Sequence, residues 1–152
     1  MELSNPAQVF AEDFDFSKSL VYRKTSTIPV SNVKKVAQRT QVITKIDAFE
    51  ETKNVANPGD FIVTGFKGEQ YVIRGDRFYN LYELDSSGSN YISKNQVRAR
   101  VLKDSSRLFA PWGEMQVVRA GGYICQSCDE PKDVYLVDKE VFENTYAPLG
   151  VA

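Results

Sequence analysis

The sequence contains one pattern twice. Residues 58–84 read PGDFIVTGFKGEQYVIRGDRFYNLYEL, and residues 120–149 read AGGYICQSCDEPKDVYLVDKEVFENTYAPL. Each copy opens at a turn, continues as two β-branched, aromatic stretches joined by a loop, and ends with aromatic residues spaced as on one face of a short helix. A chain of 152 residues that repeats itself in this way is restricted to folds with two similar hairpin-based halves.

Matched positions support a duplicated fold over a coincidence of two unrelated hairpins. The pairs are Gly59 with Gly121, Phe61 with Tyr123, Ile62 with Ile124, Tyr71 with Tyr135, Phe78 with Phe142, and Tyr82 with Tyr146. The offset grows from 62 to 64 across the hairpin loop, where insertions are best tolerated. Apolar positions match and polar positions drift, as expected when both copies conserve a core.

Local signals define the elements of each copy. The stretch 57–60 predicts a turn in which Asp60 binds backbone amides, and Lys67-Gly68 predicts a tight hairpin turn. A short helix should follow each hairpin, with Asp76 and Asp138 as the N-cap residues. Upstream, segments such as QVITKIDAF and NQVRARVLK alternate with a period of two and predict further strands.

These elements predict an α+β fold of two tandem β-hairpin-plus-short-helix repeats that form small antiparallel sheets. We expect an N-terminal arm at residues 1–19, a first repeat unit at 20–84 and a second at 91–149, separated by the polar loop DSSGSN. The pattern leaves open whether the two repeats build one compact core or two.

The first copy resembles the PGDYG-motif proteins, a group of small proteins from bacteria and their phages. The resemblance covers residues 22–84, with a weaker second copy to residue 149. It rests on Tyr22-Arg23-Lys24, Pro58-Gly59-Asp60-Phe61, Gly68-Glu69, Tyr71, Phe78 and Tyr82-Glu83. Ile62 stands where the motif has its second glycine, and the second copy lacks the proline and the aspartate. The resemblance implies a small β-rich fold and carries over no catalytic residue.

Composition excludes several kinds of chemistry. Hydrophobic residues make up 42% of the chain, the formal net charge is -1, and the pI is near 5.6, which is typical of a soluble globular protein. There is no histidine, so the chain by itself cannot build a Ser-His-Asp or Cys-His catalytic set. No apolar run is long enough to span a bilayer, and the acidic N-terminus resembles neither a signal nor a transit peptide.

The two cysteines form a CxxC motif at Cys125 and Cys128. Such a motif can be half of a zinc site or a redox pair, but zinc needs four ligands, and the chain offers neither a second CxxC nor a histidine. Cys125 aligns with Val63, a core strand position where a free cysteine acts as a small apolar residue. A structural role is therefore expected and no cofactor is assigned, while a metal site shared with another chain and a redox pair stay as alternatives.

Charge is segregated along the chain. Residues 16–45 contain seven basic and no acidic residues, whereas residues 129–143 are predominantly acidic. A nucleic-acid surface is conceivable, but segregated charge on a slightly negative protein is more typical of docking faces, so the pattern disfavours nucleic acid as the partner.

The missing catalytic groups and the separated charge predict a non-catalytic protein-interaction module, or an accessory subunit of a larger assembly. We expect protein partners to dock on the arm and on sheet edges. The docking candidates are Phe10, Phe14, Phe16, Arg23, Lys24, Lys34 and Lys35. The alternative is a small anionic ligand or nucleotide bound between the two repeats by Tyr and Arg or Lys side chains.

Overall fold

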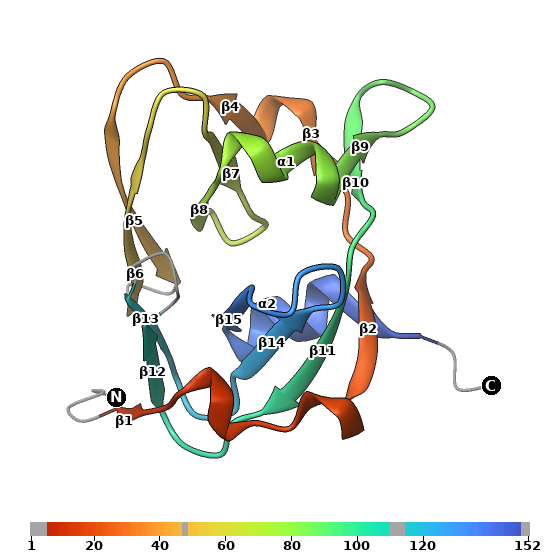
Figure 1. Ribbon diagram of the computed structural model, residues 1–152. Helices are drawn as coiled ribbons and strands as arrows, with labels where there is room; N and C mark the ends of the chain where they lie inside the picture. Colours follow the sequence, from red (N-terminus) through yellow and green to blue (C-terminus); the bar gives the residue numbers. More distant parts are fainter. Residues whose placement is uncertain (1–5, 47–48, 110–114, 150–152) are drawn as a thin grey trace. The chain divides into compact units, whose positions relative to one another are not determined.

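The computed structural model describes residues 6–46, 49–109 and 115–149 (Figure 1). Within these ranges the chain forms sixteen strands, two α-helices and three 3₁₀ turns. The strands are β1 (Ala7–Gln8), β2 (Leu20–Lys24), β3 (Ile28–Pro29), β4 (Val33–Lys35), β5 (Thr40–Ile46), β6 (Phe49–Ala56), β7 (Phe61–Thr64), β8 (Gln70–Ile73), β9 (Tyr82–Leu84), β10 (Asn90–Ser93), β11 (Gln96–Val101), β12 (Ser106–Phe109), β13 (Met115–Val118), β14 (Tyr123–Ser127), β15 (Val134–Val137) and β16 (Tyr146–Pro148). The helices are α1 (Gly75–Leu81) and α2 (Lys139–Thr145).

The predicted α+β fold is wrong, because the structure is mostly β. Each helix is only seven residues long. Each also stops at a tyrosine with extended backbone: Tyr82 has φ -135° and Tyr146 has φ -125°. These tyrosines begin β9 and β16, which pair with other strands, so sheet hydrogen bonds replace further helical turns.

Internal contacts divide the chain into two compact units. Unit 1 combines the residues up to Lys24 with those from Gln96 onward, and unit 2 is the continuous segment Thr25–Asn95. The chain therefore leaves unit 1 after β2, completes unit 2, and returns to unit 1 at β11.

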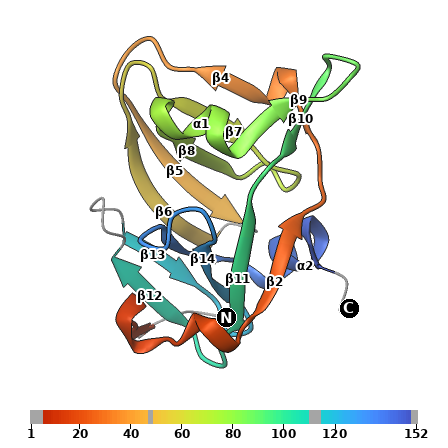
Figure 2. The ribbon, with the colours of Figure 1, turned by 45° about the vertical axis from the view of Figure 1, so that its right-hand side comes forward.

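Unit 1 contains a five-stranded antiparallel sheet in the order β15-β14-β11-β2-β16. Figure 2 shows β11 and β2 running side by side in this sheet. A second group of strands has β12 between β13 and the short N-terminal strand β1, which runs parallel to β12. The buried core between these strands consists of Phe16, Leu102, Leu108, Val118, Ile124, Val134 and Leu136.

Unit 2 contains the hairpin β5–β6 and two three-stranded groups, β4-β7-β8 and β3-β10-β9. One core cluster is centred on Phe61 and Phe78, and a second consists of Val36, Val42 and Ala56. The alternating burial of β7 matches the period-two pattern of its sequence, with Phe61 and Val63 pointing inward.

The same turn occurs before β7 and before β14. Gly59 and Gly121 have positive φ angles of 94° and 89°, a conformation that favours glycine. The Gly59 N–H donates to the Val36 carbonyl at 2.9 Å, and the Gly121 N–H donates to the Leu102 carbonyl at 2.8 Å. These bonds tie each turn to the residue that follows β4 or β11, the strand that pairs with the first strand of the hairpin.

The two helices begin differently. Asp138 is the N-cap of α2, as predicted, and its carboxylate accepts from the Glu140 N–H at 3.1 Å. The predicted cap at Asp76 is wrong, because α1 starts at Gly75 and has Arg74 at the N-cap position. The Asp60 carboxylate accepts from the Gly75 N–H at 3.2 Å and from the Asn57 N–H at 2.9 Å, so it ties the turn to the helix start.

No helix in the described part of the chain is long and apolar enough to cross a membrane.

Candidate functional site

Each helix places a buried phenylalanine among aromatic rings of its own unit. In unit 2, Phe78 stacks on Phe61 at 4.2 Å between ring centroids. Tyr82 lies 5.4 Å from Phe78, and Tyr91 meets it edge-on at 5.0 Å. Phe78 is 0% exposed, so this group of four rings, the unit 2 aromatic cluster, is packed core.

Unit 1 contains the corresponding group. Phe142 stacks on Tyr123 at 3.9 Å and on Tyr146 at 4.6 Å, and Tyr22 meets it edge-on at 4.9 Å. Phe142 is 2% exposed. We call these four rings the unit 1 aromatic cluster. Sequence reasoning matched three of the four rings in each cluster, but it missed Tyr22 and Tyr91. The signal was available, because each tyrosine lies in the first strand of its repeat unit, in VYRK and in YISK.

Two tyrosine hydroxyls meet beside the unit 1 aromatic cluster. The hydroxyls of Tyr135 and Tyr146 are 3.5 Å apart. Burial raises the pKa of Tyr135 well above its ordinary value, and the neighbouring Tyr146 adds to the shift. A phenol held neutral in this way is suited to hydrogen bonding in the core rather than to proton transfer near neutral pH.

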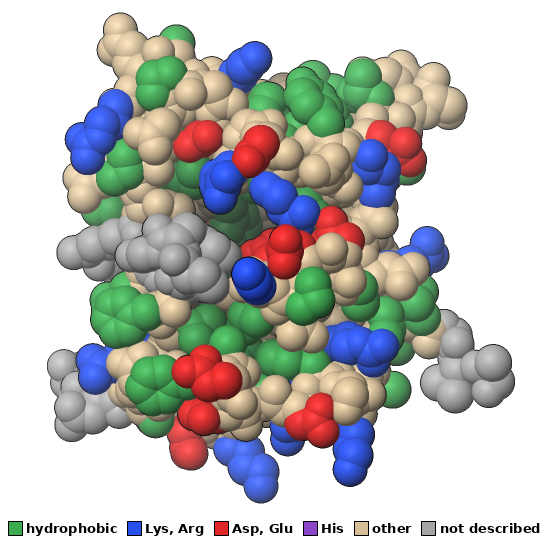
Figure 3. Space-filling view, viewed as in Figure 1, with side chains coloured by type: hydrophobic (Ala, Val, Ile, Leu, Met, Phe, Trp, Pro, Cys, Tyr) green, Lys and Arg blue, Asp and Glu red, His purple; other side chains and the backbone are tan. Residues whose placement is uncertain are grey.

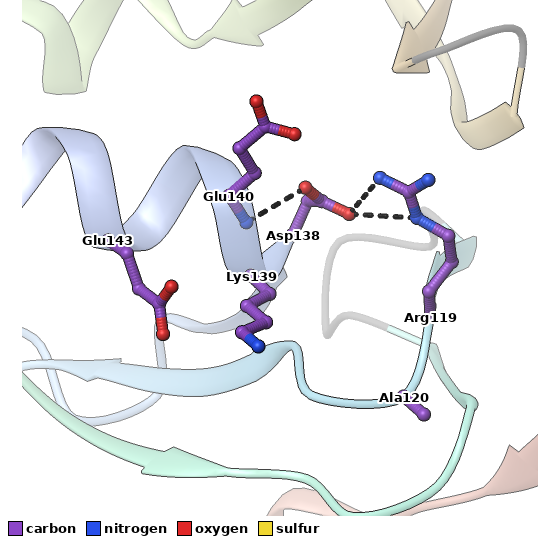
Figure 4. Close-up of a pocket in the computed structure, with 6 residues that line it drawn as sticks. All are labelled: Arg119, Ala120, Asp138, Lys139, Glu140 and Glu143. Carbon is purple, nitrogen blue, oxygen red and sulfur yellow. Dashed lines mark hydrogen bonds and ion pairs between the residues drawn. The ribbon is translucent and has the colours of Figure 1, made fainter.

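A cleft of about 380 Å³ opens at the start of α2 in unit 1 (Figure 4). It is lined by Arg119, Ala120, Asp138, Lys139, Glu140 and Glu143. Arg119 donates to Asp138 Oδ1 through Nε at 3.1 Å and Nη2 at 2.8 Å, while the other Asp138 oxygen caps the helix. The Arg119 guanidinium and the buried Asp138 carboxylate are therefore engaged with each other and with the start of α2. Because the lining has three carboxylates and two cations, the cleft does not favour an anionic ligand.

Glu69 is a buried carboxylate that the sequence reasoning noted only as part of the family motif. It is 2% exposed and accepts from the Lys67 N–H at 2.8 Å and from the Tyr71 hydroxyl at 3.0 Å. It also fills the space beside Gly65 that a Cβ would need. Glu69 therefore holds the β7–β8 turn in one shape, and its buried side-chain oxygens have hydrogen-bond donors.

The two cysteines lie in different surroundings. Cys125 is buried in β14, opposite Ala99 and Tyr135, and burial raises the pKa of its thiol strongly. Cys128 is exposed just past the end of the strand, and partial burial raises its pKa as well. Both thiols are free, and no group of three or more metal-ligating side chains occurs among the residues described. A raised thiol pKa is the opposite of what a reactive cysteine needs.

The docking candidates of the N-terminal arm are distributed between core and surface. Phe16 is buried in the unit 1 core, and Phe14 packs against that core with the Arg100 guanidinium 5.7 Å over its ring. Phe10 is exposed. The arm is thus built into unit 1 through β1 and these aromatic side chains.

The basic docking candidates fall in separate units. Arg23 is exposed and Lys24 half-buried on β2 of unit 1, whereas Lys34 and Lys35 are exposed on β4 of unit 2. Strand β4 is at the end of its three-stranded group. Lysines on such an edge oppose the addition of another strand.

Three large, exposed apolar side chains lie on or next to the strands β1, β12 and β13. Phe109 and Met115 are directly paired across β12 and β13, and they are 56% and 40% exposed. The Val9 N–H bonds to the Arg107 carbonyl at 2.9 Å as part of the pairing of Gln8 with Arg107, and Phe10, 50% exposed, follows directly after this pairing. Val9 and Leu108 pack into the core, whereas Phe10 and Phe109, the residues that follow them, are exposed.

We call Phe10, Phe109 and Met115 the apolar patch. Figure 3 shows hydrophobic side chains gathered over the β12–β13 region. Sequence reasoning identified Phe10 but missed the other two residues. The sequence offered no usable signal, because Ser106–Phe109 reads SRLF and does not alternate polar and apolar residues although its burial alternates, and nothing local indicated that β1 would pair beside it.

No protein-family model, curated protein or solved structure matches the chain. The resemblance to the PGDYG-motif proteins therefore stays a prediction.

Proposed function

We propose that the chain is a non-catalytic protein-binding module, or an accessory subunit of a larger assembly, that docks through the apolar patch. The observation that carries the proposal is the cross-strand pair of Phe109 and Met115, 56% and 40% exposed, together with Phe10, 50% exposed, just past β1 on the other side of β12. Single exposed apolar residues are ordinary on protein surfaces, but contiguous ones mark interaction sites.

The patch has the character of an interface centre. Aromatic and methionine side chains are enriched in protein interfaces and carry much of the binding energy. A stable interface buries about 800 Å² on each partner, which is more than three side chains can supply. The surrounding polar surface, including the exposed Arg107 on the same face, would then form the rim.

The alternative, an anionic ligand, finds little support inside unit 1. In the cleft at α2, Arg119 is already paired with Asp138, and Glu140 and Glu143 add negative charge. No described feature of this cleft gives an anion an unengaged pair of cationic groups.

The experiment compares partner capture by three forms of the full chain. Phe10→Ser combined with Phe109→Ser removes most of the patch, and Leu84→Ser is the matched control, because Leu84 is a similarly exposed apolar residue in unit 2. Crosslinked complexes from the native source would be quantified by mass spectrometry. We expect at least a tenfold loss of one reproducible partner with the patch variant and none with the control.

Equal capture by all three proteins would refute the proposal. Deleting residues 1–19 is a poor test, because it also removes Phe16 from the core and would confuse docking with folding.

A further inference from the structure

One strand of the large sheet in unit 1 comes from the other half of the sequence. Four strands, β11, β14, β15 and β16, follow residue 95, but the strand between β11 and β16 is β2. Tyr22 of β2 is paired with Val97 on one side and with Pro148 on the other. The Leu149 N–H extends this pairing by donating to the Val21 carbonyl at 2.9 Å.

Unit 2 has the reverse arrangement. Its strands β3 and β9 are separated by β10, the strand that opens the second half of the sequence. Tyr91 of β10 is paired with Ile28 on one side and with Leu84 on the other. Each unit is therefore completed by the first strand of the opposite repeat.

The two exchanged strands make equivalent side-chain contacts. Tyr22 meets the ring of Phe142 at 4.9 Å and 74°, and Tyr91 meets the ring of Phe78 at 5.0 Å and 85°. In both cases the phenylalanine belongs to the helix of the unit that the strand completes. Two independent strands would have no reason to match in position, residue and ring geometry.

We propose that the slot between β11 and β16, and the corresponding slot between β3 and β9, are strand-binding sites that recognise an extended segment with a central tyrosine. In this protein each slot binds the first strand of the other repeat, so the chain is a single-chain form of a strand-exchanged pair. Hydrogen bonds on both edges of the bound strand supply affinity, and the tyrosine supplies specificity.

The proposal implies that the two halves bind each other as separate polypeptides. The loop Asp85–Asn90 between the halves is a suitable place to cut, because its residues 86–89 are exposed. A protease recognition sequence would be inserted between Ser87 and Gly88 in the full chain, and the folded protein would be cleaved. The mass of the product would be measured by light scattering over a range of concentrations.

We expect the cleaved wild-type protein to keep the mass of both fragments. Replacing both Tyr22 and Tyr91 by alanine should weaken association of the fragments at least about tenfold. Tyr79→Ala is the matched control, because Tyr79 also contacts Phe61 and Phe78 but belongs to the same half as both rings. It should change the association less than about twofold.

Separation of the cleaved wild-type protein into two species would overturn the proposal, as would equal association of the wild-type and double-variant fragments. If the double variant does not fold, hydrogen exchange on the cleaved wild-type protein decides. Amides in residues 20–24 and 90–93 should stay as protected as in the uncut chain, and exchange at the rate of an unpaired peptide would refute strand binding.

Discussion

Truncating the central phenylalanine of either aromatic cluster should destabilise its own unit by a large and similar amount. Phe78 and Phe142 are both almost fully buried, and each contacts at least three other rings. Transfer of a buried phenylalanine side chain contributes about 1.5–3 kcal/mol, and the cavity left behind raises the cost of Phe→Ala to about 3–5 kcal/mol. We expect about 4 kcal/mol for Phe78→Ala and for Phe142→Ala.

This cost is a large part of the stability of a small protein, which is about 5–15 kcal/mol in total. With a denaturant slope of about 2 kcal/mol/M, each variant should unfold at about 2 M less urea than the wild-type protein. Because two units need not unfold in one step, hydrogen exchange by mass spectrometry is the better assay, since it reports the free energy of opening for each unit.

Phe78→Ala should reduce protection chiefly in residues 25–95, and Phe142→Ala chiefly in residues 96–149. Phe66→Ala is the control, because Phe66 is more than half exposed and its loss should cost less than about 0.5 kcal/mol. A cost below about 1 kcal/mol for either core variant, or costs that differ by more than about 2 kcal/mol, would show that the two rings are not equivalent core residues.

Two further predictions follow from the buried titratable groups. The Tyr135 phenol has a raised pKa, so the folded chain holds the phenol proton more tightly than the unfolded chain does. The contribution of this phenol to the free energy of unfolding is complete below pH 10, and it is lost as the pH rises above that value. Urea unfolding at increasing alkaline pH should therefore show a shallower fall in the free energy of unfolding for Tyr135→Phe than for wild type, and an identical slope would contradict this. The second prediction concerns the thiols: a thiol reagent at pH 8 should modify Cys128 in the native protein and Cys125 only after unfolding, because Cys125 is fully buried and its pKa is raised. Cys128→Ser should abolish the native reaction and Cys125→Ser should leave it, and two rapidly reacting thiols in the native protein would show that β14 opens easily.

The sequence revealed most of the hairpin positions because their signals are local. Glycine at a positive φ angle, an aspartate at a turn and alternating apolar residues act within a few positions of each other, so 57–60 and Lys67-Gly68 could be assigned as turns. The cap of α1 could not be assigned in this way. The carboxylate that accepts from the Gly75 N–H at the helix start belongs to Asp60, which lies fifteen residues earlier in the chain. Asp76 was a misleading signal for the N-cap, because it lies next to the helix start but inside the first turn.

The fold class was wrong for a related reason. The helical spacing after each hairpin is real, but it lasts only seven residues before Tyr82 or Tyr146 turns into a strand. Those tyrosines are extended because a neighbouring strand offers hydrogen bonds to them. For Tyr146 that neighbour is β2, which is distant in the sequence, and for Tyr82 it is β10, the next strand along the chain. The same limit applies to the apolar patch, since Phe10 becomes part of it only through the pairing of β1 with β12.

The sequence by itself determined that one pattern occurs twice, where its hairpins turn, and which rings recur, because each of these depends on residues close together in the chain. Only the tertiary structure decided that β2 completes unit 1 and β10 completes unit 2. A strand's periodicity records which face is buried and not which partner it pairs with, and two similar repeats offer two similar slots to each strand. The partner is chosen by long-range pairing, and no local pattern encodes that choice.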